Sequence, residues 1–258
     1  KRFYNFLPRQ FIFPQDYQEF RRVLEINDKL PESERKVYIY KPDAGNSGRG
    51  IILVRELNDI DVDSNLGKVK AVVQEYLDKP FTFSDGLKFD LRLYVYIDRV
   101  FPYSVYICQE GLCRFCTVPY EKPTSENFNN SRMHLTNFAV NKIKRDRSED
   151  TKSASHSSML LNKAILGDDE NTEHPERGIK KSLTRVFADL RSLEYDVKGL
   201  WEKILKLVEY TCATIQPHLC YELNYNFNYN DLLPQVSVDK DRLPSPSFQI
   251  IGFDVILT

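Results

Sequence analysis

Alternating apolar and polar positions along the chain predict a set of β-strands. Two runs rich in β-branched and aromatic residues flank a loop with three glycines inside residues 37–57, which predicts strand, loop and strand. Further short strands are predicted at 71–77, 88–97, 102–108, 112–118 and 248–257.

Apolar residues three and four positions apart predict helices at 14–27, 180–193 and 197–215. Residues 144–178 are polar with few apolar side chains to bury, which predicts a mobile surface loop. The run NYNFNYN at 224–230 alternates asparagine with aromatic residues and fits either a strand with one buried face or a flexible connection. The expected class is α+β, with helical and strand regions partly segregated.

Composition narrows the kind of protein. The 258 residues are 41% hydrophobic, enough for one large domain or two small ones. No apolar run approaches the ~20 residues of a membrane helix, and the first residues lack a signal peptide, so we expect a soluble intracellular protein and no membrane partner. Five cysteines without a secretory signal indicate free thiols in the reducing cytoplasm. The net charge of -1 and the lack of a basic stripe argue against nucleic acid.

The glycine-rich segment KPDAGNSGRGI is a candidate phosphate cradle. Gly45, Gly48 and Gly50 leave backbone N–H groups free to approach an anion, and Lys41 and Arg49 add positive charge. The segment is not a P-loop, because that motif opens a helix and this one leads into the strand-like IILV. The alternative is a long hairpin connection whose glycines serve only turn geometry.

Charged residues recur on the predicted strands. In KFDLRLYVYI, Lys88, Asp90 and Arg92 alternate with apolar residues and share one face, which is either the floor of a site or, more commonly, a solvated sheet face. Arg114 on another strand is a candidate member of the same cluster. Asp254 interrupts an apolar run, where a carboxylate is costly unless it is paired or bound to a metal. It is therefore the best single metal-ligand candidate.

Two polar segments offer weaker signals. The backbone of residues 74–76 could pair with the edge of an adenine. In MHLTN, His134, Thr136 and Asn137 could hydrogen-bond a ribose or phosphate, although capping or turn roles for the last two are equally consistent.

Three cysteines need separate consideration, because Cys108, Cys113 and Cys116 have the C-x4-C-x2-C spacing of an iron–sulfur site. Cys113 and Cys116 are an odd number of residues apart, so on a regular strand they point to opposite faces. The other two cysteines lie about 100 residues further on, and buried free thiols are the simpler prediction.

Taken in order, the segments FLPRQFIFPQDY, KPDAGNSGRGI, QEYL, KFDLR, RF, MHLTN and GFD resemble the tubulin tyrosine ligase-like family. The KPD…GRGI form, EYDVKGLW and IQPH resemble its polyglutamylase branch. The resemblance implies an ATP-grasp fold in which two α+β subdomains close over MgATP. They would be residues 1–80, with the glycine-rich loop, and 81–258, with the loop at 144–178 and a helical part at 180–218.

The resemblance also assigns roles to residues. It implies nucleotide contacts from the glycine-rich loop, the QEYL segment, the start of KFDLR and the end of MHLTN. It implies Mg²⁺ at one aspartate and contacts to the reacting carboxylates from three basic residues. The nucleotide set is Lys41, Arg49, Gly50, Gln74, Glu75, Tyr76, Leu77, Lys88, Asp90, Thr136 and Asn137; the metal ligand is Asp254; and the catalytic set is Arg92, Arg114 and His134.

The implied activity is an ATP-dependent ligase that adds L-glutamate to glutamate side chains of tubulin, on its acidic C-terminal tails or on microtubules, or of another protein. It would act in the cytoplasm at the cytoskeleton, including the cilium or basal body. Alternatives are a microtubule-binding pseudoenzyme, a glycylase and a small-molecule carboxylate–amine ligase. Phe138 and Ala139 stand where the family commonly has tyrosine and a small polar residue, and Asn46 and Ser47 also depart from the closest branch. The family's remaining metal ligands and another phosphate-binding lysine are expected in segments outside this sequence, which suggests truncation at both ends.

Overall fold

The computed structural model describes residues 4–44, 48–60, 66–100, 102–141, 180–227 and 248–258. Contacts divide the chain into two units, which are treated separately: residues 7–90, 114–180 and 256–258 form one, and residues 1–6, 91–113 and 181–255 form the other. The boundaries therefore fall inside three strands, and the predicted subdomain division at residue 80 stays a prediction. Within the described part of the chain, no helix is both long and apolar enough to cross a membrane.

The first unit contains a four-stranded antiparallel sheet in the order β1-β4-β2-β3. Its strands are β1 (Gln10–Phe13), β2 (Tyr38–Pro42), β3 (Ile52–Val54) and β4 (Ala71–Glu75). Strands β2 and β3 are the pair predicted on either side of the glycine-rich loop, and β4 was predicted as well. Strand β1 was not expected, because Pro8 and Pro14 flank its four residues and leave too short a run to show alternation.

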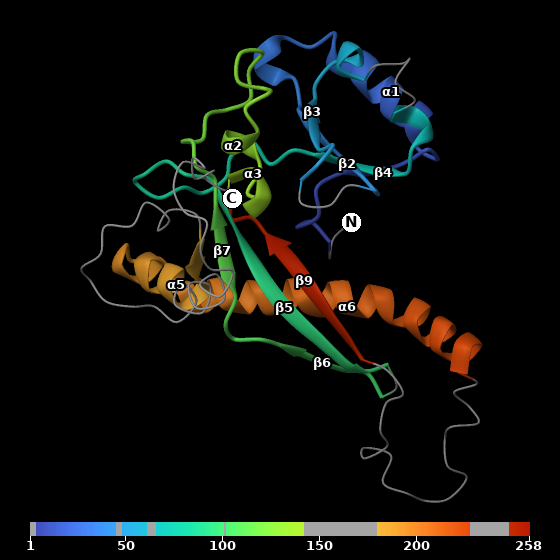
Figure 1. Ribbon diagram of the computed structural model, residues 1–258, viewed down its shortest axis with the longest axis vertical. Helices are drawn as coiled ribbons and strands as arrows, with labels where there is room; N and C mark the ends of the chain where they lie inside the picture. Colours follow the sequence, from blue (N-terminus) through green and yellow to red (C-terminus); the bar gives the residue numbers. More distant parts are fainter. Residues whose placement is uncertain (1–3, 45–47, 61–65, 101, 142–179, 228–247) are drawn as a thin grey trace, which may run out of the picture. The chain divides into compact units, whose positions relative to one another are not determined.

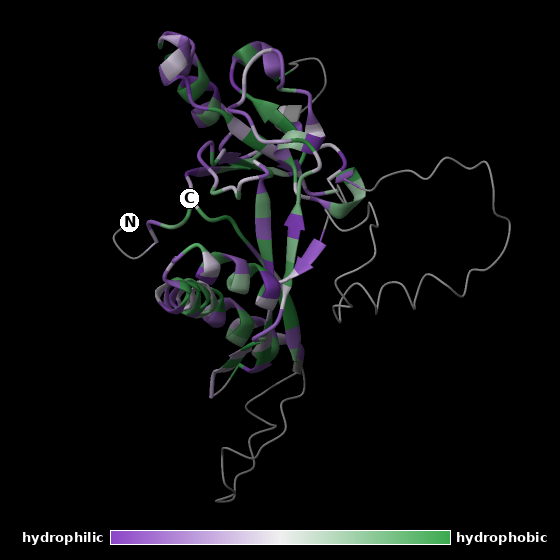
Figure 2. Ribbon diagram, turned by 90° about the vertical axis from the view of Figure 1, so that its left-hand side faces the viewer, coloured by the Kyte–Doolittle hydropathy of each residue, from purple (hydrophilic) through white to green (hydrophobic). Residues whose placement is uncertain are grey.

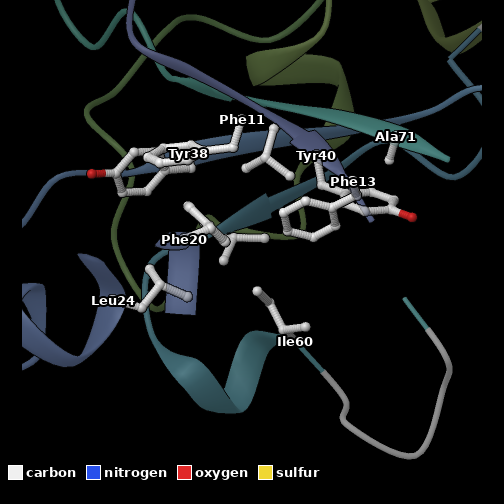
Figure 3. Close-up of a cluster of buried hydrophobic side chains, with 10 residues drawn as sticks. Phe11, Phe13, Phe20, Leu24, Tyr38, Tyr40, Ile60 and Ala71 are labelled. Atoms are coloured by element: carbon white, nitrogen blue, oxygen red, sulfur yellow. The ribbon is translucent and has the colours of Figure 1, made fainter. Parts of the chain in front are cut away.

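The helix α1 (Tyr17–Asn27) covers one face of this sheet, as its apolar spacing predicts. Figure 3 shows the side chains of α1 and the strands pointing toward one another in a single cluster. Phe20 is fully buried, with its ring centroid 5.0 Å from that of Phe11 and 5.1 Å from that of Tyr38. Tyr38 and Tyr40 of β2 point into this cluster, so the alternate residues Ile39 and Lys41 belong to the opposite face of the sheet.

The described residues of the first unit also form short elements. They are three 3-10 turns, η1 (Glu32–Glu34), η2 (Leu57–Asp59) and η4 (Leu66–Lys68), and two one-turn helices, α2 (Ser131–His134) and α3 (Phe138–Asn141). Buried Asn141 fixes α3, because its amide nitrogen donates to the carbonyl oxygen of Leu135 at 2.6 Å and its side-chain oxygen accepts from the backbone of Thr117 at 3.0 Å. Residues 135–141 are thereby held in one conformation.

The second sheet has the order β6-β5-β7-β8, and β9 also pairs with β5. Its strands are β5 (Phe89–Arg99), β6 (Ser104–Ile107), β7 (Leu112–Phe115), β8 (Lys180–Ser182) and β9 (Gln249–Val255). All but β8 were predicted. Strand β5 alternates hydrophobic and hydrophilic residues along its length (Figure 2). Leu91, Leu93, Val95 and Ile97 are almost completely buried.

The described residues of the second unit form the helices α5 (Leu183–Ser192) and α6 (Val197–Phe227). Figure 1 shows α6 running along the sheet, and Val208 and Cys212 of α6 pack with Val95 of β5 and Phe253 of β9. The predicted helix at 180–193 starts three residues too early. The hydroxyl of Ser182 caps α5 by accepting from the backbone N–H of Arg185 at 3.1 Å, and the three residues before α5 form β8.

The predicted end of the last helix was also wrong. Helix α6 continues past Pro217 to Phe227, so residues 224–227 of the NYNFNYN run are helical rather than a strand or a connection. The side chain of Asn226 donates to the carbonyl oxygen of Glu222 one turn earlier, at 2.8 Å. A strongly helical segment upstream therefore overrides the local alternation. The rest of that run and the predicted loop at 144–178 lie outside the described residues.

Candidate functional site

The glycine-rich loop lies against a second predicted nucleotide segment. Gly48 and Gly50 have φ angles of 89° and 73°, which favour glycine. A Cβ on Gly48 would lie 3.0 Å from the side chain of Val140 and 3.2 Å from Cγ of Asn137. The loop and Asn137 are therefore in contact, as a shared phosphate site would require. Gly45, Asn46 and Ser47 lie outside the described residues.

The exposed face of the first sheet carries two of the predicted nucleotide residues. Lys41 on β2 donates from Nζ to the Oε1 atom of Gln74 on β4 at 3.0 Å. Both residues lie on the face opposite the α1 core, beside the start of the glycine-rich loop. A cation and a polar amide therefore lie side by side on this face of the sheet.

Lys88, Tyr76 and His134 form one buried hydrogen-bonded network. Lys88 Nζ donates to the hydroxyl of Tyr76 at 2.7 Å and to the carbonyl oxygen of His134 at 3.1 Å. The Tyr76 hydroxyl lies 3.2 Å from His134 Nδ1, and His134 Nε2 lies 3.1 Å from the carbonyl oxygen of Asn127. A neutral imidazole protonated on Nε2 satisfies all of these contacts. Both ring nitrogens of His134 are therefore occupied.

Burial controls the charges in this network. Desolvation lowers the pKa of Lys88 to about 8, and Lys41 lowers it further, while the nearby Cys116 and Asp90 oppose the change. Burial also lowers the pKa of His134 and raises that of the Tyr76 hydroxyl. Near neutral pH the network therefore holds a cationic lysine, a neutral histidine and a neutral tyrosine. A phosphate or carboxylate beside Lys88 would stabilise its charged form.

Asp90 and Arg114 form a buried ion pair between β5 and β7. Arg114 Nε donates to Asp90 Oδ1 at 2.9 Å, and a second contact joins Arg114 NH2 to Asp90 Oδ2. The side chain of Asp90 is 3% exposed and that of Arg114 is 11% exposed. The interpretation of this strand as a solvated face is therefore wrong for Lys88 and Asp90. The prediction that Arg114 belongs to the same cluster of charges is confirmed, because Arg114 forms an ion pair with Asp90.

Sequence reasoning missed one basic residue beside this cluster. Lys180, the first residue of β8, places its Nζ 3.6 Å from the ring centroid of Phe138. Burial, and then the charge of Arg114, lowers the pKa of Lys180. In the sequence, Lys180 follows a long polar segment and was assigned to the start of a helix. The two adjacent lysines of the segment IKKS indicated positive charge at this position. The residues that contact them cannot be identified from the sequence.

Arg92 and Asp254 meet in the other unit, as cross-strand partners on β5 and β9. Arg92 Nε donates to Asp254 Oδ1 at 2.5 Å and Arg92 NH2 donates to Oδ2 at 3.0 Å. Gly252 leaves room for this pair, because a Cβ there would lie 3.2 Å from Cδ of Arg92. The carboxylate predicted for a metal is therefore bound by the arginine predicted for a substrate carboxylate.

This arrangement does not fit a formed Mg²⁺ site. Magnesium prefers about six oxygen ligands. Within the described residues, no three His, Cys, Asp or Glu side chains are grouped to hold a metal. The oxygens of Asp254 both face the guanidinium of Arg92. Binding a metal here would require that ion pair to rearrange.

A cavity of about 380 Å³ in the first unit is bordered by Glu75 and Tyr76 of the predicted nucleotide set. Arg55, Lys122 and Lys36 also border the cavity. Lys36 Nζ donates a hydrogen bond to Glu75 Oε1 at 2.7 Å. The cavity is therefore ringed by ion pairs rather than by the remaining predicted nucleotide residues. Arg49 is exposed, and Leu77 and Thr136 are half-buried. The nucleotide contacts predicted for Arg49, Leu77 and Thr136 therefore stay predictions.

The cysteines behave as free thiols. None of the five forms a disulfide, and Cys113, Cys116 and Cys212 are buried. Burial raises the pKa of the Cys116 thiol to about 12. The prediction of buried thiols is therefore confirmed for Cys113, Cys116 and Cys212 and is wrong for Cys108, which is exposed.

The chain thus has a mixed α/β fold with antiparallel sheets, and a glycine-rich loop and clustered lysines and arginines lie in its first unit. Residues 1–189 match the sequence profile of the Tubulin-tyrosine ligase family, and the chain belongs to that family. This confirms the resemblance inferred from the seven segments.

Several relatives are similar over nearly the whole chain. The chain is 34% identical over 255 residues to human "Tubulin polyglutamylase TTLL11", covering 98% of this chain and 31% of that protein. It is 33% identical to a "Probable beta-tubulin polyglutamylase" of Tetrahymena thermophila and to "Tubulin polyglutamylase ttll6" of Danio rerio, covering 18% and 27% of those proteins and 98% of this chain in each case. The chain thus spans less than a third of these relatives.

Proposed function

We propose that this chain is the nucleotide-binding core of an ATP-grasp ligase that adds L-glutamate to glutamate side chains of tubulin. The family membership and the names of the relatives support this activity. The observation that carries it is the buried basic cluster, in which Lys88 and Arg114 surround Asp90 and Lys41 lies close enough to affect the charge of Lys88. Such a cluster stabilises negative charge on a phosphoryl group as it is transferred.

In this proposal the first unit binds ATP. Lys41, Arg49 and the N–H groups around Gly50 bind the phosphates, while residues 74–77 bind adenine. Lys88, Asp90, Thr136 and Asn137 complete the site. The contact between Gly48 and Asn137 supports a common phosphate site, because it joins two segments separated by almost 90 positions.

The reaction proceeds in two steps. An oxygen of the acceptor carboxylate attacks the γ-phosphorus of ATP, forming an acyl phosphate and releasing ADP. The amine of glutamate then attacks the acyl carbon, forming an amide bond, losing a proton and releasing inorganic phosphate. Arg114 and Arg92 are the proposed cations for the reacting carboxylates. No step is assigned to Mg²⁺, because Arg92 binds both oxygens of Asp254, the predicted metal ligand.

His134 acts as a positioning residue in this scheme. Its ring nitrogens face Tyr76 and Asn127, and its backbone carbonyl oxygen accepts from Lys88. It therefore holds Tyr76 and Lys88 in place and has no free ring nitrogen for proton transfer to substrate. The proposed setting is the microtubule cytoskeleton, including the cilium or basal body, with the acidic tubulin tails as acceptors.

The test is mass spectrometry of tubulin incubated with the full-length protein, ATP and glutamate. The expected result is a series of tubulin peptides heavier by successive glutamate residues, dependent on ATP. Incorporation of glycine in place of glutamate would identify a glycylase. Microtubule binding with no ATP-dependent mass change would identify a pseudoenzyme, and either result would overturn the proposal.

A further inference from the structure

Tyr120 holds the chain directly after the residues proposed to bind adenine. Its hydroxyl donates a hydrogen bond to the carbonyl oxygen of Asp78 at 2.9 Å, and Asp78 directly follows residues 74–77. Tyr120 is itself fixed, because its backbone N–H donates to the carbonyl oxygen of Gly86 at 2.8 Å. Tyr120 therefore ties the end of the proposed adenine segment to the backbone around Gly86.

The proposed adenine segment contains a backbone donor between two fixed points. Strand β4 ends at Glu75, and the backbone N–H of Tyr76 donates to the carbonyl oxygen of Val37 at 2.8 Å. Among the described residues, none accepts a hydrogen bond from the backbone N–H of Leu77. Tyr76 fixes the chain on one side of this N–H, and the bond to the Asp78 carbonyl fixes it on the other. The position of the Leu77 N–H therefore depends on Tyr120.

The ring and the hydroxyl of Tyr120 have separate roles. The ring centroid lies 6.0 Å from that of His134, edge to face, and 5.7 Å from Lys88 Nζ. The ring also packs against the apolar cluster that contains Val37 and Tyr76. Burial raises the pKa of the hydroxyl, which therefore stays protonated and can donate to a carbonyl oxygen. The ring thus contributes packing, while the hydroxyl alone makes the bond that fixes the adenine segment.

We propose that Tyr120 is a positioning residue whose hydroxyl holds the adenine segment in place and so favours ATP over GTP. This inference rests on the proposed function and adds its nucleotide specificity. N1 of adenine accepts a hydrogen bond, whereas N1 of guanine carries a hydrogen and donates. A fixed N–H at Leu77 therefore pairs with N1 of adenine and leaves guanine without an acceptor at that position.

The experiment compares the full-length protein with its Tyr120→Phe variant, which keeps the ring and loses the hydroxyl. Titration calorimetry measures the Kd for ATP and for GTP without tubulin or glutamate, so the result does not depend on ligase activity. We expect the Kd for ATP to rise by about 3- to 10-fold, the effect of weakening one hydrogen bond to the base. The Kd for GTP should stay unchanged. A general loss of structure would weaken both nucleotides alike, so the ratio of the two Kd values separates positioning from stability.

Tyr103→Phe is the matched control, since the hydroxyl of half-buried Tyr103 donates to the carbonyl oxygen of Cys212, also at 2.9 Å. It should lower the melting temperature about as much as Tyr120→Phe and leave both Kd values unchanged. The inference is overturned if Tyr120→Phe leaves the Kd for ATP unchanged or weakens ATP and GTP equally, or if the wild-type protein binds both nucleotides equally well. ATP binding without ATP-dependent incorporation of glutamate would instead overturn the proposed function alone.

Discussion

Arg92 and Asp254 lie 162 positions apart in the sequence and are direct cross-strand partners, joined by two hydrogen bonds of 2.5 and 3.0 Å. The Arg92 side chain is 31% exposed and that of Asp254 is 47% exposed. Solvent-accessible ion pairs of this kind contribute little to stability, typically below about 1 kcal/mol. Because both side chains are solvent-accessible, their ion pair adds little to stability. Stability therefore does not explain why these two charges face each other.

Substitution of either member should separate activity from stability. We expect Arg92→Gln and Asp254→Asn each to lower turnover by roughly 100-fold or more, if they remove charges used on the transferred phosphoryl group or the reacting carboxylate. Each should change the free energy of unfolding by less than about 1 kcal/mol. Urea unfolding and steady-state glutamylation of tubulin by the full-length protein measure the two effects. Loss of stability with intact kinetics would assign the pair a purely structural role.

The buried ammonium of Lys88 predicts a pH-dependent stability. Its pKa is lowered from 10.5 to about 8 by burial, so the folded state disfavours the charged form. The cost is fully present below about pH 8 and disappears as the pH rises toward 10.5, where the unfolded chain also loses the proton. Its size is on the order of 3 kcal/mol, from a difference of about 2.5 between the two pKa values.

Wild type should therefore gain stability relative to Lys88→Met between pH 8 and 10.5. The comparison is made by urea unfolding at several pH values, with Lys79→Met as the control because Lys79 is an exposed lysine. The control should follow the wild-type profile. Parallel pH profiles for wild type and Lys88→Met would show that Lys88 is not desolvated as described.

Thiol reactivity tests the cysteine assignment. Burial raises the pKa of Cys116 to about 12, which keeps the thiol protonated and unreactive, whereas Cys108 is exposed. In the folded protein near pH 8, a thiol-specific reagent should label Cys108 quickly and leave Cys113 and Cys116 unlabelled. Peptide mapping identifies the labelled positions, and labelling in urea serves as the control. Protection of Cys108 that is lost on chelation would instead support a metal cluster.

Local pattern predicted most strands because side-chain alternation reflects burial directly. Leu91, Leu93, Val95 and Ile97 alternate with polar or exposed residues, and the sequence already shows this. The start of α5 was less predictable. Lys180 and Lys181 are good helix formers, yet they belong to β8, because pairing with β7 outweighs a weak intrinsic preference.

Candidate residues could be found from the sequence more readily than their partners. Lys88 and Asp90 were recognised as charges on a strand, but only the fold shows that Tyr76 and Arg114 meet them. The contact of Lys180 with Phe138 depends on two segments separated by about 40 residues. Such pairings follow from tertiary packing, which no local periodicity encodes.

Gly48 offers a test of the phosphate loop that is independent of charge. Its φ of 89° is strained for any other residue, and a Cβ would approach Val140 to 3.0 Å and Asn137 to 3.2 Å. Gly86 is the matched control. It has a φ of 69°, but its Cβ would meet Pro119 at an ordinary 3.6 Å. The two alanine variants therefore share backbone strain, and only Gly48→Ala displaces Asn137.

Both Gly48→Ala and Gly86→Ala should lose about 1 to 2 kcal/mol of unfolding free energy from the left-handed backbone conformation. Only Gly48→Ala should weaken ATP binding, by roughly 10-fold, because moving Asn137 removes about one hydrogen bond to the nucleotide. Titration calorimetry with the full-length protein measures the affinity, and urea unfolding measures the stability. Equal ATP affinities in the two variants would mean that the loop does not form the phosphate site with Asn137, and the glycines would then serve turn geometry alone.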